Sequence, residues 1–116
     1  MRVAGFGFRR AASLDSLRAA LALAGGEVAA LATAEAKVAG LQGLATEMGV
    51  PVIGISVQDM GRQGVQGSDR VKALYGTGSV AEAAALAAAG QGARLVVGRV
   101  TSPDGMAVAA IAEGRE

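Results

Sequence analysis

The sequence contains no cysteine and no histidine among its 116 residues. This absence excludes zinc centres, iron–sulfur clusters, thiol catalysis and histidine general-base chemistry, together with a histidine ligand to cobalt or haem iron. Carboxylates, arginine, lysine, hydroxyl groups and the backbone remain as the chemically active groups. We therefore expect neither a metal site nor a bound cofactor.

Aromatic residues are also scarce, with one Tyr, two Phe and no Trp, and 11 basic residues nearly balance 10 acidic ones. A nucleic-acid-binding domain usually has a basic face, often with aromatic side chains on which bases stack. The alanine-rich tracts stop far short of the roughly twenty apolar residues that a membrane span needs. The N-terminus has the wrong order of charged and apolar residues for a secretory signal. We expect a cytoplasmic protein that binds neither nucleic acid nor membrane.

Hydrophobic residues make up 52% of the chain, enough for one domain over residues 1–116 that needs no disulfide or metal to fold. Short apolar runs predict strands, and apolar residues at helical spacing predict helices between them. The strands are predicted at residues 3–6, 28–32, 52–55, 95–97 and 107–111, and the helices from residue 14, over residues 41–48 and from residue 80. This alternation predicts a single three-layer α/β/α domain with a mixed, mostly parallel sheet of about five strands.

The segments between these elements contain breakers and turns. Gly25 and Gly49 are expected to end the first two helices. Polar, glycine-rich residues 58–67 predict a mobile loop, and residues 68–75 predict a short helix. The Pro-Asp-Gly turn within residues 99–106 is short enough for a hairpin, so we expect the last strand to lie antiparallel to its neighbour.

The loops that lead into helices are the candidate ligand sites, because ligands of such sheets bind at the carboxyl ends of the strands. These loops cover residues 5–13, 33–40 and 76–79. Helices that flank a parallel sheet run opposite to its strands. We therefore expect the three helix starts to lie together at one edge of the sheet.

In the first loop, Gly5 and Gly7 flank a phenylalanine and are followed by Arg9 and Arg10. The segment lacks the third glycine of a dinucleotide-binding fingerprint. Positive charge just before a helix opposes the helix dipole, so an anionic partner would explain the arginine pair. The alternative is that both side chains are only solvated.

In the second loop, Thr33, Glu35 and Lys37 occupy alternate positions. In an extended backbone they would point to the same side. A carboxylate beside an ammonium group suits hydrogen bonding to a polar ligand or proton transfer. A surface ion pair of little energetic value is the alternative.

The third loop supports two compatible interpretations. It consists of Gly76, Thr77, Gly78 and Ser79. Ser79 and Glu82 have the spacing of a capping box, which predicts a helix that starts at Val80. The glycines would also let an anion approach the free N–H groups of that helix start. Capping and anion binding could therefore occur together.

Three segments together resemble a known family, CobE and the C-terminal domain of the cobalamin biosynthesis protein CbiG. They are VAGFGFRRAASLDSLRAAL, ALATAEAKVAGLQGLATEMGVPV and GTGSVAEAAALAAAGQGARLVVGRVTSPDGMAVAAIA, which cover nearly the whole chain. The resemblance implies a three-layer α/β fold and a role in corrin ring synthesis. CbiG-like enzymes open a lactone on a cobalt precorrin and release acetaldehyde. These 116 residues leave no room for the N-terminal portion of CbiG, so we expect a CobE-like protein and not the hydrolase.

Two local departures from the family pattern also bear on this comparison. Phe8 stands where many CbiG-like sequences have cysteine. Arg99 begins a segment that replaces a lysine-containing stretch common in the family, so no role of those lysines carries over.

The resemblance suggests a ligand, because precorrins and hydrogenobyrinic acid carry carboxylates around a flat apolar ring. Arginine, lysine and helix starts suit such a molecule. The predicted binding residues are Gly5, Gly7, Arg9, Arg10, Thr33, Lys37, Gly76, Thr77, Gly78 and Ser79. We expect a CobE-like carrier or accessory factor. A precorrin side-chain hydrolase or lyase with Glu35 and Lys37 as catalytic groups, and a scaffold for other pathway enzymes, remain alternatives. The sequence leaves monomer and homodimer open.

Overall fold

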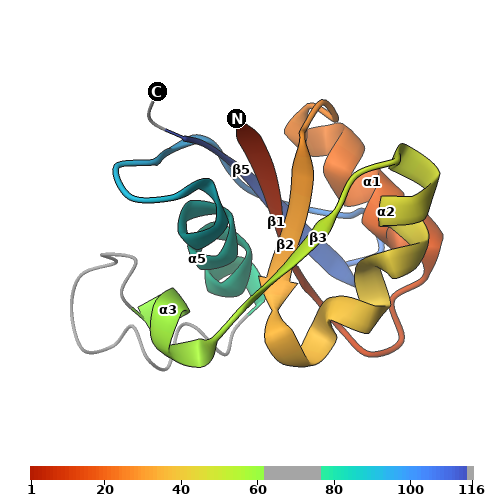
Figure 1. Cartoon of the computed structure of the whole chain (residues 1–116). Helices are drawn as coiled ribbons and strands as arrows, with labels where there is room; N and C mark the ends of the chain where they lie inside the picture. The colour runs from red at the N-terminus through yellow and green to blue at the C-terminus, as the bar shows by residue number, and fades with distance from the viewer. Residues whose placement is uncertain (62–76, 115–116) are drawn as a thin grey trace.

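The computed structural model describes residues 1–61 and 77–114, and Figure 1 shows their arrangement. The strands are β1 (Arg2–Phe8), β2 (Ala30–Ala34), β3 (Val52–Ile55), β4 (Arg94–Thr101) and β5 (Ala107–Glu113). The helices are α1 (Leu14–Ala24), the 3-10 helix η1 (Glu35–Leu41), α2 (Gln42–Met48), α3 (Val57–Gly61) and α5 (Thr77–Ala89). None of the helices in these two ranges has the length and apolar character that crossing a membrane requires.

The described strands form one sheet in the order β3-β2-β1-β5-β4. β1 pairs with β2, and β2 with β3, in parallel register. β5 lies antiparallel to both β1 and β4, so four of the five strands run in the same direction. The predicted mostly parallel sheet and the predicted hairpin before the last strand are both confirmed.

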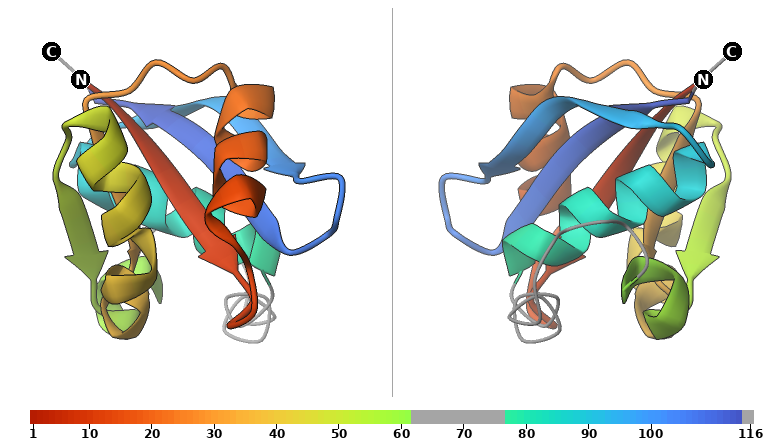
Figure 2. Two further views of the ribbon diagram at one scale, coloured as in Figure 1. Left: turned by 90° about the vertical axis from the view of Figure 1, so that its right-hand side faces the viewer. Right: turned by 90° about the vertical axis from the view of Figure 1, so that its left-hand side faces the viewer.

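Helices cover both faces of the sheet, which confirms the predicted three layers. α1, η1 and α2 lie on one face and α5 lies on the other, as Figures 1 and 2 show from three sides. The large buried side chains Phe6, Leu17, Leu31 and Leu44 fill the face under α1 and α2. The face under α5 contains mostly alanines. Alanine buries little area per residue, but it lets a helix approach a sheet closely.

A helix approaches the sheet very closely at Gly5. A Cβ atom there would lie 2.0 Å from the Ala81 carbonyl oxygen and 2.5 Å from the Ala85 amide nitrogen. Near the other end of the helix, a Cβ atom at Gly114 would lie 2.8 Å from the Ala89 carbonyl oxygen. α5 therefore runs opposite to β1, from the edge where β1 ends to the edge where it begins.

The start of α5 differs from the sequence prediction. The helix begins at Thr77 rather than Val80, so Ser79 lies within its first turn and is not the N-cap. Glu82 does not complete a capping box. Its Oε2 atom accepts a hydrogen bond from the Arg99 backbone N–H of β4 at 3.2 Å. A tertiary contact therefore replaces the local one that the Ser79 and Glu82 spacing predicted.

Two further predictions need correction or lie outside the described residues. Residues 58–61 of the predicted loop belong to α3. The rest of that loop and the whole of the predicted helix over residues 68–75 lie in the range 62–76, outside the described residues. Gly25 and Gly49 do end α1 and α2, with φ angles of 119° and 73° that favour glycine.

Candidate functional site

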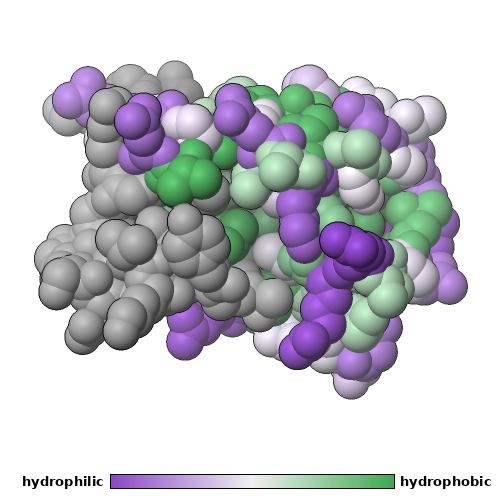
Figure 3. Space-filling model, turned by 90° about the horizontal axis from the view of Figure 1, so that it is seen from below, coloured by the Kyte–Doolittle hydropathy of each residue, from purple (hydrophilic) through white to green (hydrophobic). Residues whose placement is uncertain are grey.

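The candidate site is the edge of the sheet at which β1, β2, β3 and β4 end, here called the carboxyl edge. β5 begins at this edge, where Ala107 pairs with Phe8. The β1–α1 turn, η1, the start of α5 and the β4–β5 hairpin all lie here, as the sequence predicted for the helix starts. Figure 3 shows this edge from below, with strongly hydrophilic residues beside apolar surface.

Arg9 and Arg10 lie in the turn between β1 and α1. The Arg9 N–H donates to the Met106 carbonyl oxygen of the hairpin at 2.9 Å, and the Ala12 N–H donates to the Arg9 carbonyl oxygen at 2.9 Å. Both arginine side chains are exposed. Within residues 1–61 and 77–114, neither guanidinium group forms an ion pair or a side-chain hydrogen bond. The backbone of this turn is hydrogen-bonded to the hairpin and within itself, while its charges have no protein partner in the described chain.

Three other arginines, Arg2, Arg18 and Arg94, have carboxylate partners. At the opposite edge of the sheet, Glu113 accepts from Arg2 at 3.5 Å and from Arg94 at 3.3 Å. In α1, Arg18 contacts Glu47 through two nitrogens at 2.7 Å each. Arg9 and Arg10 therefore differ from these three arginines, while the exposed Arg99 side chain of β4 resembles that pair in having no carboxylate partner among the described residues.

Lys37 of η1 contacts the last residue of β1. Its Nζ atom donates to the Phe8 carbonyl oxygen at 2.5 Å and lies 4.9 Å from the centroid of the Phe8 ring. Phe8 immediately precedes Arg9, so a third cation lies one peptide unit from the arginine turn. A Cβ atom at Gly40 would lie 2.6 Å from the Phe8 ring, which shows how closely η1 packs against this residue.

The predicted alignment of Thr33, Glu35 and Lys37 is wrong, because β2 ends at Ala34 and η1 begins at Glu35. Thr33 is fully buried, and its hydroxyl group donates to the Phe6 carbonyl oxygen of β1 at 2.8 Å. Glu35 is exposed, and its carboxylate makes no hydrogen bond within the described part of the chain. Thr33 therefore holds β1 and β2 together.

The glycine positions of the predicted site have different structural surroundings. Gly5 lies beneath α5, and Gly7 is a buried β1 residue that pairs with Val108. Gly76 lies outside the described residues. The backbone of residues 77–79 forms the first turn of α5, where N–H groups have no partner within the helix. A role of these residues in anion binding stays a prediction.

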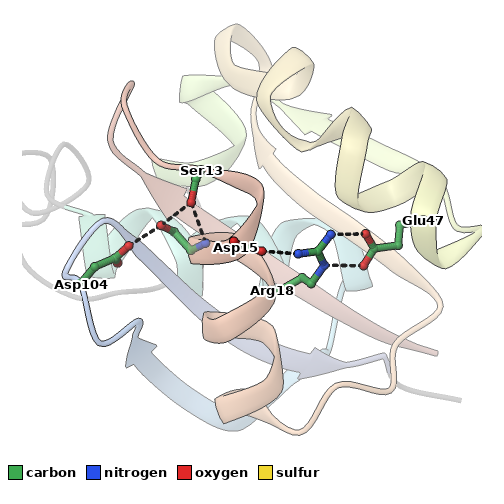
Figure 4. A network of polar contacts seen from close by, with 6 residues as sticks. Ser13, Asp15, Arg18, Glu47 and Asp104 are labelled. Atoms are coloured by element: carbon green, nitrogen blue, oxygen red, sulfur yellow. Dashed lines mark hydrogen bonds and ion pairs between the residues drawn. The ribbon is translucent and has the colours of Figure 1, made fainter.

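A hydrogen-bond network that the sequence reasoning missed joins the hairpin to α1 (Figure 4). The Asp104 carboxylate accepts from the Ser16 hydroxyl at 2.5 Å, the Ser102 hydroxyl at 2.6 Å and the Met106 N–H at 3.0 Å. The two hydroxyl groups, Ser102 first, hold the pKa of Asp104 below its ordinary value. Ser13 caps α1 by accepting from the Ser16 N–H at 3.1 Å. The Pro-Asp-Gly turn was visible in the sequence, but its contact with Ser16 was not.

A second polar group joins α1 to α2. Arg18 contacts Glu47 of α2 and Asp15 of its own helix (Figure 4). The hydrogen bonds from Arg18 lower the pKa of Glu47. This group lies on the helices that cover one face and links α1 to α2 across the surface. In the described ranges, no cluster of three Asp or Glu residues could hold a metal ion.

Comparison with known proteins identifies the family. Residues 2–112 match the family model of the cobalamin synthesis G C-terminus. The chain belongs to this CbiG C-terminal family. It is 34% identical to CobE, a protein from the cobalamin (vitamin B12) biosynthetic pathway, with a TM-score of 0.76 and coverage of 97% of this chain and 92% of that one. The resemblance noted in the sequence is confirmed, and the chain is a cobalamin biosynthesis protein of the CobE and CbiG C-terminal type.

Two further solved structures extend the comparison. The cobalamin biosynthesis protein chiG from Agrobacterium tumefaciens is 34% identical over 100% of both chains, with a TM-score of 0.70. A putative cobalamin biosynthesis protein G homolog from Sulfolobus solfataricus is 15% identical, with a TM-score of 0.72, and shares only the fold. The aligned region covers 99% of this chain but only 37% of that protein. A comparison with curated protein sequences finds no match.

Proposed function

We propose that the protein binds a carboxylate-rich precorrin or hydrogenobyrinic acid and serves cobalamin biosynthesis as a carrier or accessory factor. The observation that carries the proposal is the exposed Arg9 and Arg10 pair, which has no carboxylate partner in the described chain while Arg2 and Arg94 share one. Family membership supports the pathway, and the carboxylates around the corrin ring suit the charge of the turn.

The energetics favour an anionic ligand at this turn. Guanidinium groups bind carboxylates through paired, charge-assisted hydrogen bonds, each worth roughly 1.5–3 kcal/mol. Because Arg9 and Arg10 have no described ion pair, ligand binding breaks no protein contact of theirs. Lys37 adds positive charge one residue away through its contact with Phe8. The N–H groups at the start of α5 add further donors to the proposed site.

The same contacts favour binding over catalysis. Lys37 already donates to the Phe8 carbonyl oxygen, which makes it a poor acid or base for a substrate. Glu35 is exposed, and no described residue hydrogen bonds to its carboxylate. The precorrin hydrolase or lyase that would use these two residues is therefore the second candidate.

The test is a visible-absorbance titration with hydrogenobyrinic acid and cobalt-free precorrins. We expect Arg9→Gln/Arg10→Gln to weaken binding at least tenfold, since about 1.4 kcal/mol corresponds to a factor of ten. Arg2→Gln/Arg94→Gln is the matched control, because it removes the same charge from the opposite edge of the sheet. Equal losses in the two double variants would reject a site at the turn.

Mass analysis of the recovered ligand separates the remaining possibilities. An unchanged mass after tight retention supports the carrier role. A changed mass that Glu35→Gln abolishes supports the enzyme instead. If the wild-type protein retains none of the compounds, the proposal of a corrinoid ligand is wrong, and co-purification with pathway enzymes becomes the next measurement.

A further inference from the structure

Asp104 is linked to both ends of the segment 9–16 that carries the arginine pair, directly at Ser16 and through Met106 at Arg9. Through Oδ1 it accepts from the Met106 N–H at 3.0 Å, and the Met106 carbonyl oxygen accepts from the Arg9 N–H at 2.9 Å. Through Oδ2 it accepts from the Ser16 hydroxyl in the first turns of α1 at 2.5 Å. One carboxylate therefore connects the hairpin directly to Ser16 after the turn and, through Met106, to Arg9 within the turn.

The Asp104 carboxylate is occupied by hydrogen bonds from neighbouring groups. Three groups, the hydroxyls of Ser16 and Ser102 and the Met106 N–H, donate to the carboxylate, and no described cation forms an ion pair with it. A negative charge near a site for a polyanion opposes binding electrostatically. If Asp104 contributes to such a site, the contribution must come from geometry.

We propose that Asp104 is a positioning residue that fixes the Arg9–Arg10 turn for its ligand. The inference rests on the proposed function for the ligand, while the ordering of the turn can be tested without one. A turn that is already ordered loses less conformational entropy on binding than one that must become ordered.

Three single variants separate geometry from charge. Asp104→Ala removes the network and a negative charge, whereas Asp104→Asn removes the charge but keeps an oxygen acceptor for Met106 and a nitrogen donor for the Ser16 oxygen. Asp15→Ala is the matched control. Asp15 lies next to Ser16 in the first turn of α1, but its carboxylate contacts Arg18 rather than the hairpin.

The first readout is affinity for hydrogenobyrinic acid, measured well below the unfolding temperature of each variant. We expect Asp104→Ala to weaken binding about fivefold through the lost ordering of the turn, Asp104→Asn to stay near wild type and Asp15→Ala to leave affinity unchanged. Tighter binding in both Asp104 variants would show that only charge matters and overturn the inference. Unchanged affinity in Asp104→Ala would overturn it as well.

The second readout needs no ligand. Trypsin cleaves after arginine, and cleavage in a folded protein requires local opening. We expect Asp104→Ala to raise the rate of trypsin cleavage after Arg9 and Arg10. The rate of cleavage after Arg18, in the middle of α1, should not rise to match. Equal increases at all these bonds would indicate global unfolding and reject the positioning role.

The two readouts distinguish failure of the inference from failure of the proposed function. If the wild-type protein binds no corrinoid, the ligand proposal is wrong, and selective cleavage in Asp104→Ala would still support ordering of the turn by Asp104. If the wild type binds and the Arg9 and Arg10 variant loses affinity, but Asp104→Ala behaves like Asp15→Ala in both assays, only the role of Asp104 is rejected.

Discussion

The arginines at the two edges of the sheet differ in whether a carboxylate binds them. At the edge where β1 begins, Arg2 and Arg94 share the carboxylate of Glu113. At the carboxyl edge, Arg9 and Arg10 have no such partner among the described residues, and the nearby Asp104 carboxylate is bonded to two hydroxyl groups and an N–H. A net charge of +1 over the whole chain conceals this difference. The position of a charge, and what already binds it, therefore says more about ligands than the total.

α5 connects the two edges, and Gly5 sets its distance from the sheet. We expect Gly5→Ala to have the largest effect of the changes considered, because its methyl group would overlap the Ala81 carbonyl oxygen and the Ala85 amide nitrogen. The free energy of unfolding should fall by about 3 kcal/mol or more, measured by urea denaturation.

Gly43→Ala provides the control for this substitution. Gly43 is exposed in α2, and an added Cβ atom there would meet only the Leu14 Cδ1 atom at 3.9 Å. Its stability should stay the same or rise by up to about 1 kcal/mol, because alanine favours a helix. A small effect in both variants would contradict the close backbone contact between β1 and α5.

A medium effect on the free energy of unfolding is expected from Thr33→Val. Thr33 lies just inside the carboxyl edge. The change removes the buried hydroxyl group that donates to the Phe6 carbonyl oxygen while it preserves side-chain shape. We expect the free energy of unfolding to fall by about 1–3 kcal/mol. Thr46→Val on the exposed side of α2 should change it by no more than about 0.5 kcal/mol. Equal effects would mean that the Thr33 hydrogen bond contributes nothing to joining β1 and β2.

The sheet could be predicted from the sequence because buried strands consist of short apolar runs that the sequence shows directly. The apolar runs located all five strands, and the Pro-Asp-Gly turn identified the β4–β5 hairpin. Gly25 and Gly49 ended helices as expected because the required φ angles favour glycine. These signals are local, so a single sequence contains them.

The geometry of the candidate site depended on distant contacts. Lys37 reaches Phe8 across 29 residues, and Ser16 reaches Asp104 across 88. The spacing of Ser79 and Glu82 fitted a capping box, but the Glu82 carboxylate instead accepts a hydrogen bond from a backbone N–H of β4. The residue types of the site were therefore readable from the sequence, whereas their partners required the packing of η1, α5 and the hairpin.

Among the substitutions that remove or disturb a contact, the smallest effect on stability is expected from Glu113→Gln, which also gives the most direct test of the contrast between the edges. Glu113 is partly exposed and its two ion pairs measure 3.3 and 3.5 Å, so their loss should lower the free energy of unfolding by less than about 1 kcal/mol. The variant leaves Arg2 and Arg94 without their carboxylate, yet these side chains lack the helix start and the ordered turn of the carboxyl edge. We therefore expect no new affinity for hydrogenobyrinic acid in an absorbance titration. If Glu113→Gln gained a second corrinoid site, missing partners alone would suffice to bind the ligand, and the geometry around Arg9 and Arg10 would have no special role.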